Sequence, residues 1–181
     1  SGVEFVIDNE PADCVISAVE RCYHKAKADW LWFSNDDLIS ETEGLDEIFK
    51  QCTEHFTDKV AMFYPNDGLF GYRFPCFPLV AKECIRGLFP SPYKRYKVDD
   101  SIRDIIPVDR RYYIGNVLMR HSNYSTNFND FGFNLGDGRV YLQDKEAMTH
   151  DHNVFVGREQ NDLRAKLLFQ NEEKMKCFQL A

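Results

Sequence analysis

The chain has 181 residues, of which 44% are hydrophobic and 28% are charged, a composition typical of an ordinary globular protein. Its formal net charge of -7 at pH 7 argues against nucleic-acid binding, which depends largely on Lys and Arg side chains that neutralise phosphates. We therefore predict one domain over residues 1–181, with a sizeable core and no nucleic-acid partner.

The cysteine content and the hydropathy indicate a reducing compartment. The six cysteines form no CxxC pair, and several stand among apolar residues, where a thiol packs as a small hydrophobic group. No apolar run approaches the roughly 20 residues that cross a bilayer, and the first residues lack a secretion signal. We expect a soluble, cytoplasmic protein with reduced cysteines and no transmembrane segment.

The first half of the sequence alternates between strand and helix patterns. Residues 3–7 have a strand pattern, residues 13–28 form an amphipathic helical pattern with Asp13 as N-cap, and residues 30–33 form a short apolar strand typical of burial on both faces. A helix over residues 42–56 and a strand over residues 60–64 continue the alternation. This order predicts a βαβ arrangement.

The second half contains shorter elements. Residues 79–88 carry short elements, and a helix begins near Asp99 and must end before Pro107. Further strand patterns occur at residues 112–114, 117–119 and 140–142, with a Gly/Asn-rich loop over residues 122–138 that we expect to be mobile. A final amphipathic helix fits residues 160–178.

Two adjacent carboxylates, Asp36 and Asp37, follow the apolar strand at residues 30–33. Open α/β sheets bind ligands outside the carboxyl ends of their strands, which places this pair where a ligand is expected. Neighbouring carboxylates repel each other unless a cation lies between them, and their hard oxygen atoms suit Mg²⁺ or Mn²⁺, which can clamp a diphosphate. The alternative is a turn in which one of the two acids caps the next helix.

Residues 26–37 read Ala-Lys-Ala-Asp-Trp-Leu-Trp-Phe-Ser-Asn-Asp-Asp and resemble the metal and nucleotide-sugar motif of GT-A glycosyltransferases. The resemblance implies a three-layer α/β/α, Rossmann-like fold with a mixed sheet. By this match Asp37 ligates Mn²⁺ or Mg²⁺, and Asp36 contacts the ion or the donor. Asn35 departs from the pattern by standing where many relatives carry the first acid, and by its position it is a candidate donor contact. Two strands and their helices precede the piece that resembles residues 3–37 in typical members, so we expect an N-terminally shortened version of the fold.

Residues 96–105 are similar to the acidic segment that opens the acceptor-side helix of the same family. One acid of that segment often serves as the base, because a carboxylate must take a proton from the acceptor hydroxyl during transfer. We expect Asp100 in this role, with Asp99 second. The alternative for each is that it only caps the helix and interacts favourably with its positive end.

Three histidines resemble the late histidine of the family, whose imidazole can complete the metal shell. His121 follows one strand pattern, while His150 and His152 follow strand-like residues further along the chain. The sequence does not decide between His121 and the pair. A surface or core histidine with no ligand is the alternative for each.

The turn at residues 66–68 faces the same end of the predicted sheet as Asp36. Asp67 and Tyr72 are candidate acceptor contacts, while Arg73 and Trp32 are candidate donor contacts through a phosphate interaction and ring stacking. Turn chemistry is the alternative explanation for Asp67, because Asn-Asp-Gly readily adopts tight bends.

Together these features predict a metal-dependent glycosyltransferase of the hexosyltransferase type. It moves a sugar from a nucleotide-diphosphate donor to a carbohydrate or other hydroxyl acceptor. Two alternatives stay open. A metal-dependent nucleotidyltransferase or phosphoesterase would use the same Asp pair, and a degenerate, non-catalytic domain of the same fold would bind carbohydrate or serve in assembly.

Overall fold

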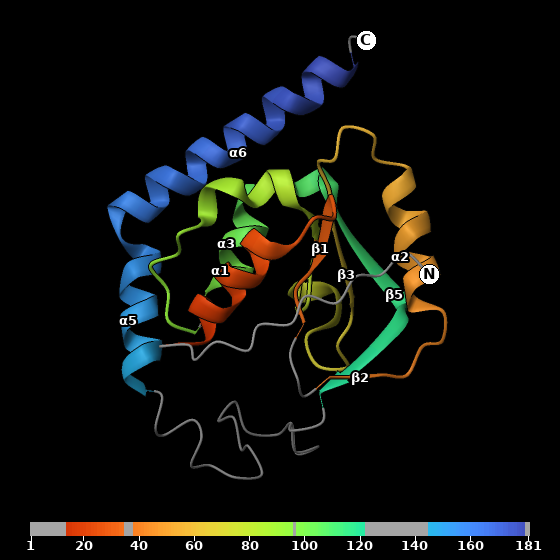
Figure 1. Cartoon of the computed structure of the whole chain (residues 1–181), viewed down its shortest axis with the longest axis horizontal. Coiled ribbons are helices and arrows are strands. Elements are labelled where there is room, and N and C mark those ends of the chain that lie inside the picture. Colours follow the sequence, from red (N-terminus) through yellow and green to blue (C-terminus); the bar gives the residue numbers. More distant parts are fainter. Residues whose placement is uncertain (1–13, 35–37, 96, 122–144, 180–181) are drawn as a thin grey trace.

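The computed structural model describes residues 14–34, 38–95, 97–121 and 145–179, which form one sheet flanked by helices (Figure 1). The strands are β1 (Trp30–Trp32), β2 (Leu38–Ser40), β3 (Met62–Asn66), β4 (Leu79–Ala81) and β5 (Arg111–His121). The helices are α1 (Val15–Lys25), α2 (Leu45–Glu54), α3 (Val98–Ile105), α5 (Lys145–Val156) and α6 (Arg158–Gln179). Three 3₁₀ helices are η1 (Gly71–Arg73), η2 (Lys82–Leu88) and η3 (Val108–Arg110).

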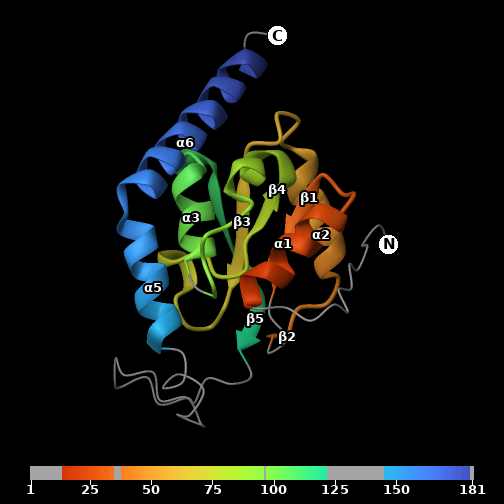
Figure 2. The ribbon, with the colours of Figure 1, turned by 60° about the vertical axis from the view of Figure 1, so that its left-hand side comes forward.

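The five strands lie in the order β1-β4-β3-β5-β2 (Figure 2). Strand β4 pairs antiparallel with both β1 and β3, whereas β3 and β5 are parallel. Strands β1, β3 and β5 therefore run in the same direction, and we call the end of the sheet where they finish the carboxyl end and the opposite end the amino end. The expected α/β class with a mixed sheet is confirmed.

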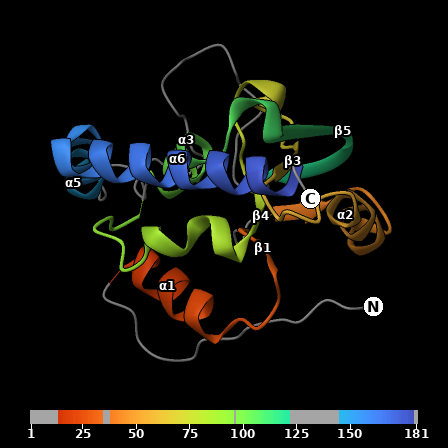
Figure 3. The same cartoon turned by 90° about the horizontal axis from the view of Figure 1, so that it is seen from above.

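Helices cover both faces of the sheet, as Figure 3 shows from above. Residues of β3 alternate between the faces, as the period of two in a strand requires. Met62 and Tyr64 pack with the side that carries α1, α3 and α6, and Phe63 packs with Phe49 of α2 on the other side. Ile102 of α3 is fully buried on the first side, which stabilises the fold by about 2 kcal/mol relative to exposure.

The strands differ from the sequence expectation in their burial and pairing. Trp30, Leu31 and Trp32 are half-buried instead of buried on both faces, because β1 lies at the end of the sheet order among the described strands. The run from Met62 to Pro65 is fully buried, since β3 lies between β4 and β5. Strand β2 was not expected, and the two strand patterns at residues 112–114 and 117–119 belong to the single strand β5.

The helices largely follow the sequence. Helix α3 ends at Ile105, and Ile106 takes an extended conformation because the following Pro107 disfavours the helical region. Helix α6 packs closely on η2 at Gly87, where a β-carbon would lie 2.6 Å from Leu167 Cδ2. Helix α5 corrects the expectation that His150 and His152 follow a strand.

Several expectations fall on residues that the structure does not describe. They are the strands at residues 3–7 and 140–142 and the loop at residues 122–138. The expectation of Asp13 as N-cap is wrong, because α1 begins one residue later and its N-cap is Cys14. All six cysteines are free thiols, with Cys76 and Cys84 buried. Among the described helices, none combines the length and apolarity that a bilayer span requires.

Candidate functional site

The end of β1 is joined by hydrogen bonds to the segment that leads into β4. The Phe33 N–H donates to the Pro78 carbonyl at 3.0 Å, and Trp32 Nε1 donates to the Phe77 carbonyl at 3.1 Å. From Ser34 the chain continues into Asn35, Asp36 and Asp37, which lie outside the described residues. The predicted metal-binding pair therefore follows a strand that finishes at the carboxyl end.

Asp67 follows β3 at the same end and is almost fully buried, with 1% of its surface exposed. Its Oδ1 accepts the backbone N–H groups of Leu69 at 3.1 Å, Phe70 at 2.9 Å and Gly71 at 2.9 Å. This carboxylate oxygen therefore organises the turn that becomes η1, as the turn explanation of the sequence predicts. Its Oδ2 is buried and has no hydrogen-bond partner of good geometry among the described residues.

The pKa of the Cys76 thiol is affected by three acids at the carboxyl end. Burial raises the pKa of its thiol far above the ordinary value, and the negative charges of Asp67, Asp99 and Asp100 raise it further. The thiol therefore stays protonated. We call Asp67, Asp99 and Asp100 the acidic cluster, because residues from two distant segments act on one buried sulfur atom.

Helix α3 carries two members of the acidic cluster in its first turn, where its dipole favours negative charge. Asp100 forms ion pairs with Lys97 at 3.1 Å and with Arg103 at 3.3 Å. Asp99 Oδ1 accepts the Asp100 backbone N–H at 2.9 Å. The two neighbouring acids therefore have different surroundings, and Asp100 is the one neutralised by cations.

The pKa of the Asp99 carboxyl group is shifted toward neutral pH. Burial raises the pKa of its carboxyl group to about 6, and the negative charge of Asp100 contributes in the same direction. A carboxylate with such a pKa is mostly ionised at pH 7 and still accepts a proton readily. Asp99, which was the second choice for the base after Asp100, has the electrostatic character of a general base.

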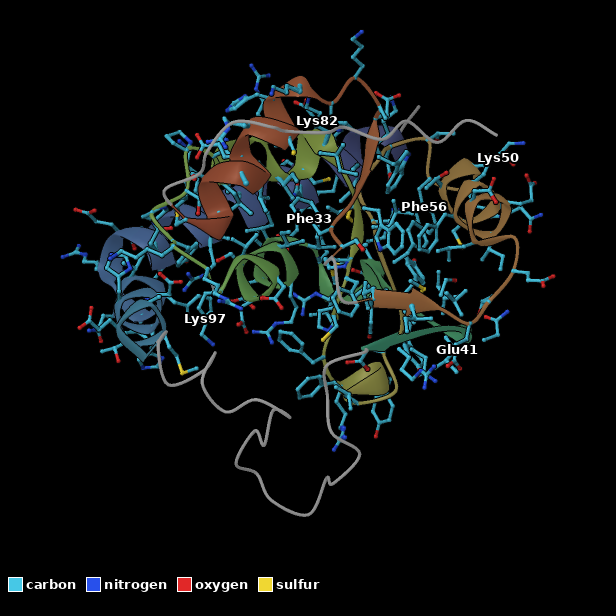
Figure 4. The ribbon with its side chains drawn as sticks, turned by 60° about the horizontal axis from the view of Figure 1, so that its bottom comes forward. Phe33, Glu41, Lys50, Phe56, Lys82 and Lys97 are labelled. Atoms are coloured by element: carbon cyan, nitrogen blue, oxygen red, sulfur yellow. The ribbon has the colours of Figure 1, made fainter. Side chains whose placement is uncertain are left out.

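Backbone strain is found beside the acidic cluster. Phe77, next to Cys76, has φ of 53°, and Lys97, the N-cap of α3, has φ of 71°. Residues other than glycine rarely adopt such angles, and strained positions persist where the surrounding structure enforces them, often at functional sites. In Figure 4, which looks onto the carboxyl end, Phe33 lies near the middle of the view and Lys97 lies beside α3.

Strand pairing distinguishes among the three candidate histidines. Leu38, which is bonded to Asp37, is the antiparallel partner of His121. Paired Cα atoms of antiparallel strands are about 4.5–5.5 Å apart. The main chain of His121 therefore lies beside that of Leu38, a pairing that no sequence pattern could reveal.

His150 and His152 occupy a different setting on α5. His150 Nδ1 lies 2.8 Å from Oδ1 of Asp151, a fully buried residue whose carboxylate accepts the backbone N–H groups of Lys94 and Arg95, both at 2.9 Å. His152 is exposed. The Asp151 carboxylate therefore holds the segment that leads to α3 in place.

Among the described residues, no group of three or more His, Cys, Asp or Glu side chains is arranged to hold a metal ion.

The remaining predicted contacts divide into exposed and packed residues. Tyr72 is 74% exposed, and Arg73 is exposed with its Nη2 donating to the Leu69 carbonyl at 3.3 Å. Both belong to η1, which the turn around Asp67 holds at the carboxyl end. Trp32 instead packs edge-on against Phe49 of α2, with ring centroids 5.4 Å apart.

Sequence reasoning missed Cys76, Lys97 and Arg103. The two cations stand three residues before and after Asp100, a helical spacing at which side chains meet, so this signal was present in the sequence. Arg103 also lies over the ring of Phe74, with 5.4 Å between its guanidinium carbon and the ring centroid.

Comparison with models of protein families, with curated proteins and with solved structures gave no match for this chain.

Proposed function

We propose that the chain is a metal-dependent glycosyltransferase of the GT-A type, which moves a sugar from a nucleotide-diphosphate donor to a hydroxyl acceptor. One observation carries the proposal. The acidic cluster lies at the carboxyl end of a mixed sheet, the end at which β1 finishes four residues before Asp36 in the sequence. Open α/β sheets bind their ligands at this end, and the resemblance of residues 26–37 implies a nucleotide-sugar there.

The residues for a metal site fit Mn²⁺ or Mg²⁺ by their chemistry. Asp36 and Asp37 supply hard carboxylate oxygens, and His121 is the histidine whose main chain lies beside Leu38. A bound ion would neutralise charge on the departing diphosphate. Within this proposal His121 takes precedence over His150 and His152, because His150 contacts Asp151 and His152 faces solvent.

We assign the base to Asp99 in preference to Asp100. The acceptor oxygen forms a bond to the anomeric carbon, the bond from that carbon to the donor phosphate breaks with its electron pair leaving on the diphosphate, and the hydroxyl proton passes to the carboxylate. The pKa of about 6 suits Asp99 to this transfer. Asp100, held by Lys97 and Arg103, positions the first turn of α3.

The test is turnover with Mn²⁺ and a panel of nucleotide-diphosphate sugars, followed by product analysis. Release of nucleoside diphosphate together with a new glycoside is expected. Asp99→Asn should lower kcat by about 100-fold or more, since general-base catalysis contributes typically 10²–10⁴-fold. Asp109→Asn, which changes an exposed acid in η3 at the amino end, is the matched control.

Three outcomes would contradict the proposal. Release of nucleoside monophosphate or pyrophosphate would identify a nucleotidyltransferase or phosphoesterase. Full activity of Asp99→Asn would remove the base. If none of the nucleoside diphosphates raises Tm in the presence of Mn²⁺, the chain would instead be a degenerate, non-catalytic module. The reason is that a ligand that binds the folded state must stabilise it.

A further inference from the structure

A concave site lies at the amino end of the sheet, opposite the acidic cluster. Its cavity of about 430 Å³ is in the range of small-molecule sites. Its lining residues come from α1, the connection from α1 to β1, the residue Lys59 before β3, η2 and α6, of which α6 runs along the top of Figure 1. The lining consists of the buried Tyr23, the small Ala28, and seven charged residues: Lys27, Asp29, Lys59, Lys82, Glu83, Arg86 and Lys174. We call it the amino-end pocket.

The charge of the amino-end pocket opposes that of the whole chain. Five of its lining side chains are cationic and two are acidic, an excess of three positive charges in a protein of net charge -7. Such a concentration in a concave surface raises the local concentration of anions. An evenly solvated face would not gather cations from four separate segments of the chain.

Part of this positive charge serves the fold. Lys82 Nζ donates to the Ala26 carbonyl at the end of α1, and Lys59 pairs with Asp29 at 2.7 Å. Within the described residues, neither Lys27 nor Lys174 forms an ion pair or hydrogen bond. These two lysines are available to a ligand without breaking an internal contact.

Tyr23 gives the pocket a neutral hydrogen-bonding group. Its ring stacks on Phe89 with centroids 4.6 Å apart, and Lys82 Nζ lies 5.0 Å from its centroid. Burial raises the pKa of the Tyr23 hydroxyl above its ordinary value, and the charge of Glu83 acts in the same direction. The hydroxyl therefore stays protonated and can donate to an anionic oxygen.

We propose that the amino-end pocket binds a small anion that carries a diphosphate group, separately from the proposed transfer site. The excess of three positive charges matches the charge of a diphosphate near neutral pH. Lysine ammonium groups on flexible stems suit phosphate as point charges, and Tyr23 adds a neutral donor. The cavity is larger than a diphosphate alone, which leaves room for an attached organic group.

The test is titration calorimetry of the whole chain with inorganic pyrophosphate, in EDTA and at low ionic strength. EDTA removes the divalent ions that the proposed transfer site needs, so that the two proposals fail independently. Lys27→Gln combined with Lys174→Gln should weaken binding by about tenfold or more. Lys166→Gln, an exposed lysine of α6 outside the pocket, is the control and should change the Kd less than about twofold.

Further arms sharpen the assignment. Tyr23→Phe keeps the stacked ring and should weaken pyrophosphate about threefold to tenfold, as expected for one lost hydrogen bond. A nucleoside diphosphate that binds more tightly than pyrophosphate, and that loses affinity in the same double variant, would identify a nucleotide as the ligand. Equal affinity would identify free diphosphate.

The proposal is overturned by any of three results. Pyrophosphate does not bind the chain at millimolar concentration, the double lysine variant binds as tightly as the Lys166→Gln control, or citrate binds as tightly as pyrophosphate. Circular dichroism melting of each variant separates loss of binding from loss of fold, because Lys27 and Lys174 make no ion pair that the described part of the chain needs.

Discussion

The two ends of the sheet carry opposite charges on one small scaffold. At the carboxyl end the charges of Asp67, Asp99 and Asp100 all raise the pKa of the buried Cys76 thiol. At the amino end five cationic side chains line a concave pocket. The strands themselves are largely apolar, so the chemistry of each end comes from the segments that connect them. A net charge computed over the whole sequence conceals this division.

The two ends also differ in how much their charges cost the fold. At the carboxyl end Asp67 is buried, Asp99 and Asp100 are half-buried, and Phe77 and Lys97 have positive φ, a strain that the amino end shares at Lys59 with its φ of 54°. Buried like charges and strained backbone both destabilise a protein, and they concentrate at functional sites. At the amino end Lys27 is exposed on a long stem that keeps its ammonium group hydrated, and Lys59 and Lys82 have partners in Asp29 and the Ala26 carbonyl, so these charges cost little.

The largest expected difference between the two ends of the sheet is in their effect on activity. Under the proposed function, Asp37→Ala should reduce sugar transfer by about 1,000-fold or more, because the proposal makes Asp37 a metal ligand whose loss removes several kcal/mol of charge stabilisation. Steady-state turnover measures the loss, and the Mn²⁺-dependent rise in Tm should disappear with it. Asp109→Ala at the amino end should leave both unchanged. Comparable losses in the two variants would show that the carboxyl end has no special role.

The next effect is on stability. Asp67→Ala removes the acceptor of three backbone N–H groups from a buried turn, which should cost about 3 kcal/mol of unfolding free energy. Urea denaturation measures this change. Asp67→Asn retains an amide oxygen in place of Oδ1 and should lose less than half as much. Equal losses would mean that the charge of Asp67, and not the turn, matters.

A smaller effect concerns the pH dependence of stability. The folded-state pKa of Asp99 is about 6, above the unfolded value near 3.8, so the folded protein binds more protons between these values. Stability should fall by roughly 2 kcal/mol as pH rises from 4 to 6, since one pKa unit is worth about 1.4 kcal/mol and solvent screens part of the charge. Asp99→Asn should remove this decline, as measured by denaturation at each pH. A variant with the same decline as the parent chain would assign the proton to another group.

The smallest effect is expected at the amino end. Replacing Lys27 and Lys174 together with glutamine should change the unfolding free energy by no more than about 0.5 kcal/mol, because surface substitutions away from specific contacts have small effects. Thermal unfolding without added anion measures it. A loss of several kcal/mol would show that these cations hold the fold, and the contrast between the two ends would weaken.

Local patterns in the sequence predicted the elements better than their pairing. Helix α3 and its end before Pro107 follow from helix and proline rules that act within a few residues. The antiparallel insertion of β4 between β1 and β3 depends on contacts between distant residues. That insertion brings Cys76 to the acidic cluster, which explains why sequence reasoning missed it.

In the candidate site too, local sequence patterns predict less than contacts between distant residues determine. The pairing of Leu38 with His121, which favours one histidine of three, is fixed by strand register and not by any motif. The difference between Asp99 and Asp100 arises from burial and from Lys97 and Arg103 together. Only the i±3 spacing of these two cations around Asp100 was visible in the sequence.

The carboxylate of Asp151 ties the last part of the chain to the segment before α3. Through the Lys94 and Arg95 backbone amides, a residue of α5 anchors a loop that is more than fifty positions upstream. During synthesis on the ribosome, this loop must wait for Asp151 to emerge before it can be anchored. A nascent chain that stalls ahead of that point should therefore leave the start of α3 unsecured, although every residue of the acidic cluster has already been made.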